Sequence, residues 1–226
     1  MSQDDDIQHG QYDPHRLIFH MSLVGVVICA LGILATMIAL SHRIGWQIFN
    51  LHIDVLGDYL RSPLAYLYNV SLLLAGGCFV LAMLGLYLLR HNRFTLMLSL
   101  AGTTVGVGIM LLGVYPYNDT AAHHMAVTFF ICTTMVLFSL LVLCRFSHPY
   151  LCSPGLWLAS LLGIAASVLL LMELAPEALL QHQCPAYQWC YTALLMWWHT
   201  LMTMAAGIGL ALMARRLLLE RNPTLG

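Results

Sequence analysis

The sequence predicts an all-α integral membrane protein, a six-transmembrane-helix bundle with both termini cytoplasmic. Two observations predict the fold class. The 226 residues are 60% hydrophobic and only 8% charged, whereas a soluble domain has about 25% charged residues and needs polar side chains over its surface. In addition, six apolar runs each reach the ~20 residues that cross a bilayer. A third observation, the placement of the arginines, predicts the orientation.

The apolar runs contain a single charged residue, Glu173. Helices are the economical interpretation, because a spanning segment must satisfy its own backbone hydrogen bonds. An outer-membrane barrel would show alternating segments of about ten residues instead. The six predicted helices cover about 17–41, 64–89, 94–114, 124–144, 155–175 and 191–214, forming a membrane domain over 17–214.

Polar tails flank this domain at residues 1–16 and 215–226. The first tail is acidic, with Asp4-Asp5-Asp6, and the apolar run after it is too long for a signal peptide, which begins with a basic region. The first run is therefore expected to be a retained membrane helix.

Positive charge is enriched in cytoplasmic loops. With six spans the two termini share a side, which holds Arg16, Arg90, Arg93, Arg145, Arg215, Arg216 and Arg221, whereas only Arg43 and Arg61 lie on the other. Both tails are therefore predicted to be cytoplasmic. The membrane is expected to be the cytoplasmic membrane of a prokaryote. The loops 42–63, 115–123 and 176–190 then face outward.

The first outer loop, Ile44 to Pro63, mixes apolar and polar residues. This pattern is typical of a short interfacial helix, or of a re-entrant cap packed over the bundle. Either structure would bring Asp54 and Asp58, spaced i and i+4, onto one face.

The densest polar segment of the apolar chain is Gly113 to His124. Its proline and its Asn118-Asp119 pair predict a tight turn between the third and fourth helices, with His123 starting the fourth. Ionisable or amide groups inside a membrane indicate function by default, although a buried histidine such as His199 can also be neutral and bonded to another helix. The candidate site comprises Asp119, Asp58, His123 and His199 as catalytic groups, and Asn69, Asp54 and His124 as substrate-binding groups.

The last outer loop contains Cys184 and Cys190. The outer compartment is oxidising, so these two cysteines are candidates for a disulfide. Two free thiols are the alternative. The other cysteines show no metal-ligand spacing.

Three segments resemble the domain-of-unknown-function family numbered 998, a prokaryotic relative of the Frag/DRAM/Sfk membrane protein family. They are His52-Ile53-Asp54-Val55-Leu56-Gly57-Asp58, then Ser62-Pro63 through Asn69 to Gly76, and Gly113-Val114-Tyr115-Pro116 followed by His123. Tyr115 stands where the family usually has phenylalanine, and Asp54 where serine is common. The resemblance, over about residues 35–145, implies six helices and an outward-facing polar site. Eukaryotic relatives are linked to lipid remodelling or lipid distribution, which implies a lipid-related role.

Three function classes remain open. The first is a protein that binds or organises membrane lipid without catalysis. The second is a membrane-embedded lipid hydrolase or transferase, in which His123, His199 and Asp58 could hold a zinc ion with an open position for water. The third is a haem-binding electron carrier, which would need His123 or His124 at the same depth as His199. The net charge of −1 gives no indication of a nucleic-acid partner.

Overall fold

A computed structural model describes residues 14–89, 92–173 and 190–221. Over these residues the chain is helical, without a strand, and six helices are long and apolar enough to cross a membrane. They are α1 (Pro14–Ile44), α2 (Ala65–Leu89), α3 (Arg93–Val114), α4 (Thr120–Ser147), α5 (Pro154–Glu173) and α7 (Tyr191–Arg221).

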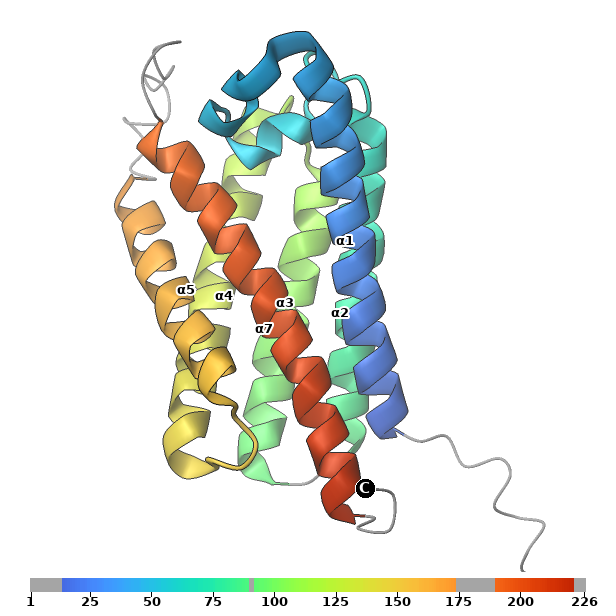
Figure 1. Cartoon of the computed structure of the whole chain (residues 1–226), viewed down its shortest axis with the longest axis vertical. Coiled ribbons are helices and arrows are strands. Elements are labelled where there is room, and N and C mark those ends of the chain that lie inside the picture. Colours follow the sequence, from blue (N-terminus) through green and yellow to red (C-terminus); the bar gives the residue numbers. More distant parts are fainter. Residues whose placement is uncertain (1–13, 90–91, 174–189, 222–226) are drawn as a thin grey trace, which may run out of the picture.

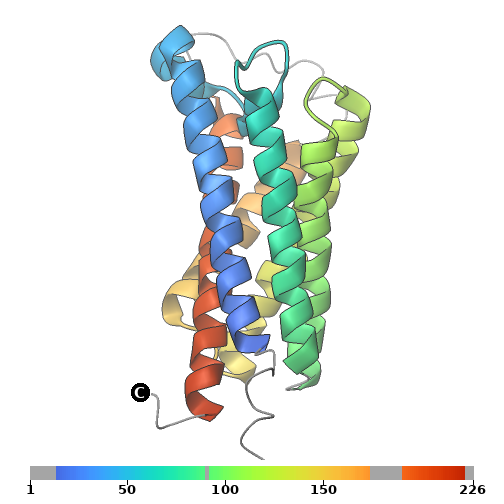
Figure 2. The same cartoon turned by 90° about the vertical axis from the view of Figure 1, so that its right-hand side faces the viewer.

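The six helices stand in a closed ring, in which each packs against the next and α7 returns to pack against α1 (Figures 1 and 2). Residues 14–16 and 215–221, which were predicted to belong to polar tails, instead extend α1 and α7. Pro14 suits the first position of a helix, where its missing N–H has no intrahelical partner. Arginine and leucine, which are good helix formers, continue the C-terminal end of α7. The rest of both tails lies outside the described residues.

Local capping accounts for three helix boundaries. Asn92 and Thr95 form a reciprocal capping box at the start of α3, and the side chain of Asp119 accepts from the Ala122 N–H at the start of α4. Helix α1 ends before Gly45, whose φ of +61° is readily adopted only by glycine. The chain therefore leaves α1 in a sharp turn and folds back over the bundle.

The loop after α1 forms a cap of two short 3₁₀ helices, η2 (Gly45–Asn50) and η3 (Ile53–Gly57) (Figure 1). Ile48, Ile53 and Leu56 of this cap are buried against the bundle. Of the two predicted alternatives, the structure thus has the packed cap. The prediction that Asp54 and Asp58 share one face of a helix is wrong, because η3 ends at Gly57 and Asp58 follows it in extended conformation.

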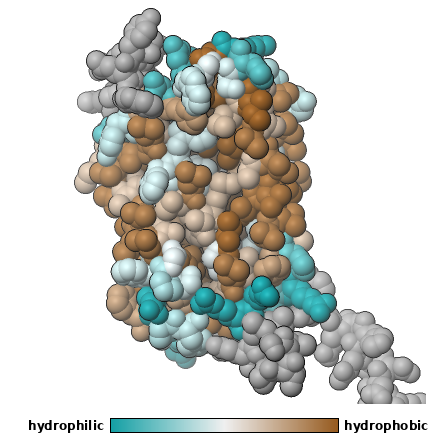
Figure 3. All heavy atoms as spheres, in the orientation of Figure 1, coloured by the Kyte–Doolittle hydropathy of each residue, from teal (hydrophilic) through white to brown (hydrophobic). Residues whose placement is uncertain are grey.

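Buried apolar side chains form two clusters along the bundle. One lies beneath the cap and includes Leu56, Tyr68 and Ile131, and the other, toward the opposite end, includes Met83, Leu98 and Phe138. The outer surface is also apolar. Figure 3 shows hydrophobic residues over the middle of the visible face and hydrophilic residues at both ends. Leu31, Leu34 and Ile38 of α1 are among the exposed apolar side chains.

The contact between α2 and α3 depends on small residues. A Cβ atom at Gly76 would lie 2.6 Å from the carbonyl oxygen of Gly106, whereas a Cβ at the adjacent Gly77 would meet nothing within 4 Å. Gly76 is therefore a test position for the close approach of the two helices, and Gly77 on the same helix is its control.

We expect Gly76→Ala to lower the free energy of unfolding by about 1–3 kcal/mol, because the backbone of α3 must move away. Gly77→Ala should be neutral or stabilising by up to about 1 kcal/mol, because alanine is the better helix former. Thermal unfolding of the purified variants in detergent measures both. Equal effects at the two positions would show that this close approach does not hold the helices together.

Candidate functional site

Polar contacts from four parts of the bundle hold the cap in place. The Asn69 side chain of α2 donates to the Gly57 carbonyl (3.1 Å), and the Trp197 indole of α7 donates to the Leu51 carbonyl (3.1 Å). Asn118, in the turn between α3 and α4, bonds both the Tyr59 N–H and Asp58. The fourth contact joins α4 to the cap through an ion pair.

That ion pair is formed by His123, in the first turn of α4, and Asp54 of η3. Their Nε2 and Oδ2 atoms are 3.4 Å apart, and each residue is only 8% exposed. The other ring nitrogen, Nδ1, lies 2.7 Å from the Tyr115 carbonyl. Since a carbonyl can only accept, Nδ1 carries a proton, and Nε2 is the nitrogen that faces the Asp54 carboxyl in an ion-pair contact rather than a hydrogen bond.

The charge state of Asp54 follows from its surroundings. Burial alone would raise the pKa of this carboxyl, but the contact with His123, and the smaller effects of His52 and His199, bring the pKa below its ordinary value. Asp54 is therefore a carboxylate. A positive charge on His123 would make this buried pair neutral overall.

Asp58 belongs to a separate network on the outer side of the cap. Its Oδ1 accepts from the Leu60 N–H and from the Asn118 side chain, both at 2.8 Å. Its Oδ2 lies 3.4 Å from Nε of Arg61. Asp58 itself is 4% exposed. These contacts involve both carboxylate oxygens and fix the α3–α4 turn to the cap.

The remaining outer candidates have different environments. Asp119 is exposed and caps α4. Asn69 is buried in its bond to the cap. His124 is half-buried, and its Nε2 has no hydrogen-bond partner among the described residues. The structure thus brings Asp54 and His123 together and gives Asp58, Asn69 and Asp119 structural contacts.

His199 lies deeper in the bundle, on α7, and is 2% exposed. Its Nε2 is 3.0 Å from the Thr134 hydroxyl of α4, and the Phe130 ring meets it edge-on. The Thr134 hydroxyl also lies 2.9 Å from the carbonyls of both Phe130 and Ile131. The Thr134 hydroxyl therefore lies between the His199 ring and the backbone of α4, within hydrogen-bond distance of both.

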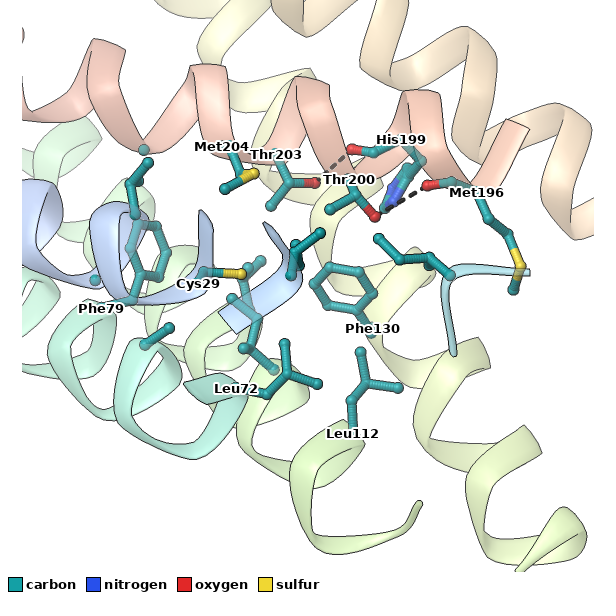
Figure 4. A pocket seen from close by; sticks show the side chains of 18 of the residues that line it. Cys29, Leu72, Phe79, Leu112, Phe130, Met196, His199, Thr200, Thr203 and Met204 are labelled. Carbon is teal, nitrogen blue, oxygen red and sulfur yellow. Dashed lines mark hydrogen bonds between the residues drawn. The ribbon is translucent and has the colours of Figure 1, made fainter. Parts of the chain in front are cut away.

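A cavity of about 90 Å³ lies between the six helices and the cap. Its wall is mostly apolar, and Figure 4 shows side chains of α7 facing those of α1, α2, α3 and α4 across it. Asp54 and His199 both belong to the wall. Most of the lining residues that are partly exposed lie on α1 and α7: Val26, Cys29, Ile33, Thr200, Thr203 and Met204. The residues of the cavity wall are therefore most exposed along this helix pair.

The arrangement of the site residues gives metal and haem ligation less support than the sequence alone did. Within the described ranges, no three His, Cys, Asp or Glu side chains are placed to hold one metal ion. Of the three residues suggested for zinc, Asp58 is held in its own network, His123 pairs with Asp54 and His199 bonds Thr134. Haem ligation by His199 would have to break its bond to Thr134, and ligation by His123 would have to break its contact with Asp54. Cys190 is disulfide-bonded, and its predicted partner, Cys184, lies outside the described residues.

Sequence reasoning missed several residues that build this site. Thr134, Phe130 and Met204 lie within apolar runs and carry no signal of their own. Trp197 carried a weak sequence signal, because a buried indole N–H needs a hydrogen-bond acceptor. Fold and site together define a six-helix bundle with a capped internal cavity. No protein-family model, no curated protein and no solved structure matches the chain.

Proposed function

We propose that this chain is a multi-pass protein of the cytoplasmic membrane of a prokaryote, with both termini in the cytoplasm. The six long apolar helices and the apolar middle of the surface support the insertion (Figure 3). The arginines support the orientation. Arg93, Arg145, Arg215 and Arg216 lie at the end opposite the cap, which carries Arg61. The cap then faces outward.

The proposed activity is binding of lipid, without catalysis, through the cavity between the helices. The observation that carries this proposal is the apolar wall, which is contributed by all six helices and borders the surface between α1 and α7. A lipid in the outer leaflet could enter between these two helices from the side.

The size of the cavity limits the ligand. An engineered cavity of about 150 Å³ binds benzene, so 90 Å³ accommodates a few methylene groups rather than a whole lipid. The proposed occupant is the end of one unbranched acyl chain. With His123 protonated, the Asp54–His123 pair contributes no net charge at the outer end of the wall, which suits an uncharged chain.

The resemblance to family 998 also supports a lipid-related role. The three segments that carry it meet at the cap, through the bonds of Asn69 to Gly57 and of His123 to Asp54. A distant relationship to this family is part of the proposal. Its association with lipid would then extend to the present chain.

A lipid hydrolase or transferase is a second candidate, favoured by one observation. Asp54 lines the cavity while it contacts a histidine whose tautomer is fixed by the Tyr115 carbonyl. Such a pair could exchange a proton with a bound substrate. Release of free fatty acid from membrane lipid by the wild-type protein, lost in His123→Gln, would favour this second candidate over binding alone.

Filling the cavity is expected to abolish chain binding. Palmitic acid at about 100 times its Kd should stabilise the wild-type protein by about 2.7 kcal/mol, since it binds only the folded state. Cys29→Phe places a ring in the cavity wall and should remove this stabilisation, as should Thr203→Phe from α7. Thermal unfolding in detergent, with and without palmitic acid, measures the effect.

Cys132→Phe is the matched control, because Cys132 is an exposed free cysteine of α4 that does not line the cavity. It should keep the full response to palmitic acid. If Cys29→Phe and Cys132→Phe respond like the wild type, or if the wild type shows no stabilisation, the cavity is not the binding site.

A further inference from the structure

One of the contacts that hold the cap over the bundle (Figure 1) contains a histidine, the side chain that titrates between pH 5 and 8. This contact is the ion pair of Asp54 and His123. The other three cap contacts described above contain no histidine. Asp54 and the adjacent Ile53 also belong to the wall of the cavity. A change in the ion pair therefore affects both the cap and the outer end of the cavity.

The Tyr115 carbonyl restricts where His123 can carry a proton. Nδ1 lies 2.7 Å from this carbonyl and must donate to it. A neutral imidazole has a single ring proton, so Nε2 of a neutral His123 would present a lone pair. That lone pair would face Oδ2 of Asp54 at 3.4 Å, and both residues are buried. Nε2 has no hydrogen-bond partner among the described residues that could compensate.

The contact is therefore attractive only while His123 carries its second ring proton. Without this proton, two acceptors face each other in a buried place, which is unfavourable. The ring could turn and present its single N–H to Asp54, but it would then lose the bond to the Tyr115 carbonyl. Either outcome loosens the attachment of η3 to α4.

Other titratable groups surround the pair. They are His52 of the cap, Tyr68 of α2, Tyr117 of the α3–α4 turn, Asp119 of α4 and His199 of α7. His123 acts on the Asp54 carboxyl more strongly than His52 and His199 do. A variant at His123 therefore separates its contribution from theirs.

We propose that the Asp54–His123 pair is a pH-sensitive latch, which holds the cap on the bundle while His123 is protonated and releases it as the outer pH rises. Release withdraws Ile53 and Asp54 from the cavity wall, so the affinity for an acyl chain falls as the pH rises. This effect on affinity rests on the proposed function, whereas the movement of the cap does not.

Hydrogen–deuterium exchange of the cap tests the latch. The exchange of residues 53–57 is measured at about pH 6 and about pH 9 and corrected for the intrinsic pH dependence of amide exchange. We expect corrected exchange to be about tenfold faster at the higher pH in the wild type. The middle of α3 should show no difference. Equal corrected exchange of the cap at the two pH values would overturn the proposal.

Two substitutions remove the latch, and a third leaves it in place. Gln at position 123, in His123→Gln, does not titrate, and Asp54→Asn can donate its amide to a neutral His123. Both variants should show the same corrected exchange at the two pH values. His124→Gln is the matched control, because it removes the adjacent, half-buried histidine. It should keep the pH dependence. A pH dependence that persists in His123→Gln would assign the response to His52 or His199 and contradict the latch.

Binding of 1-hexadecanol, which is uncharged at both pH values, tests the link to the cavity. Its stabilisation of the wild type against thermal unfolding should be smaller at the higher pH, and it should be equal at the two pH values in Asp54→Asn. If hexadecanol stabilises the protein at neither pH, the cavity proposal fails while the exchange measurement still decides the latch. If the cap responds to pH and the stabilisation does not, the proposed effect on affinity is wrong.

Discussion

Replacing Asp54 or His123 by alanine is expected to lower the free energy of unfolding by about 3–5 kcal/mol, the largest effect of any substitution considered. Each change leaves its partner buried without a counter-charge, and removing one member of a buried ion pair typically costs this much. Both residues are only 8% exposed, so water cannot fully replace the lost contact. Chemical or thermal unfolding at neutral pH measures the loss.

The double variant Asp54→Leu/His123→Leu distinguishes the electrostatic contribution of the ion pair from the packing contribution of the two side chains. Apolar replacement of a whole buried pair is often neutral or stabilising, so this variant should be closer to the wild type than either single alanine variant is. Strictly additive losses would mean that Asp54 and His123 stabilise the cap independently of each other.

The contribution of Asp54 should also depend on pH. The pKa of this carboxyl is lowered in the folded protein, so the folded state binds the proton less tightly than the unfolded chain does. The stabilisation is therefore present above the unfolded-state pKa of about 3.9. It is lost as the pH falls through the lower folded-state pKa. Unfolding from pH 7 down to pH 3 should show this loss in the wild type, whereas Asp54→Asn should lack it.

Asp58→Ala is expected to produce the second largest effect, about 2–3 kcal/mol, because it removes a buried carboxylate that accepts two hydrogen bonds. Asn118 and the Leu60 N–H would lose their acceptor. The cap should then open more often. Trypsin cleavage after Arg61, which pairs with Asp58, provides a direct measure alongside thermal unfolding.

Asp119→Ala is the control from the neighbouring turn. Asp119 is exposed and caps a helix, so its removal should cost about 1 kcal/mol. Cleavage at Arg61 should stay at the wild-type rate. If Asp119→Ala loosens the cap as much as Asp58→Ala does, the Asp58–Asn118 contact is not what fastens it.

The helices were predictable because their apolar runs are long and nearly free of charge. Their exact ends were not, because these depend on local contacts such as the Asn92–Thr95 capping box. The role of Asp119 could have been predicted, since an aspartate directly before a helix is a preferred cap. Asp119 was included among the catalytic candidates because polar residues surround it in the sequence, and its place directly before a helix was not considered.

The pairing of the site residues was less predictable. Asp54 and Asp58 are four residues apart, yet they contact different partners because η3 is a single short 3₁₀ turn that ends at Gly57. Neither the contact of Asp54 with His123 nor that of His199 with Thr134 follows from spacing, because each depends on how distant segments pack. The cavity is a property of all six helices and has no local sequence signal.

Photocrosslinking tests the central claim, that an acyl chain end occupies the cavity, most directly. A fatty acid with a diazirine at the chain terminus would be incorporated with the protein in bilayers, irradiated, and the labelled residues mapped by mass spectrometry. We expect labelling of Leu72, Phe79 and Met204 in the cavity wall, lost in Cys29→Phe and retained in Cys132→Phe. Labelling confined to outward-facing residues such as Leu31, Leu34 and Ile38 would contradict it.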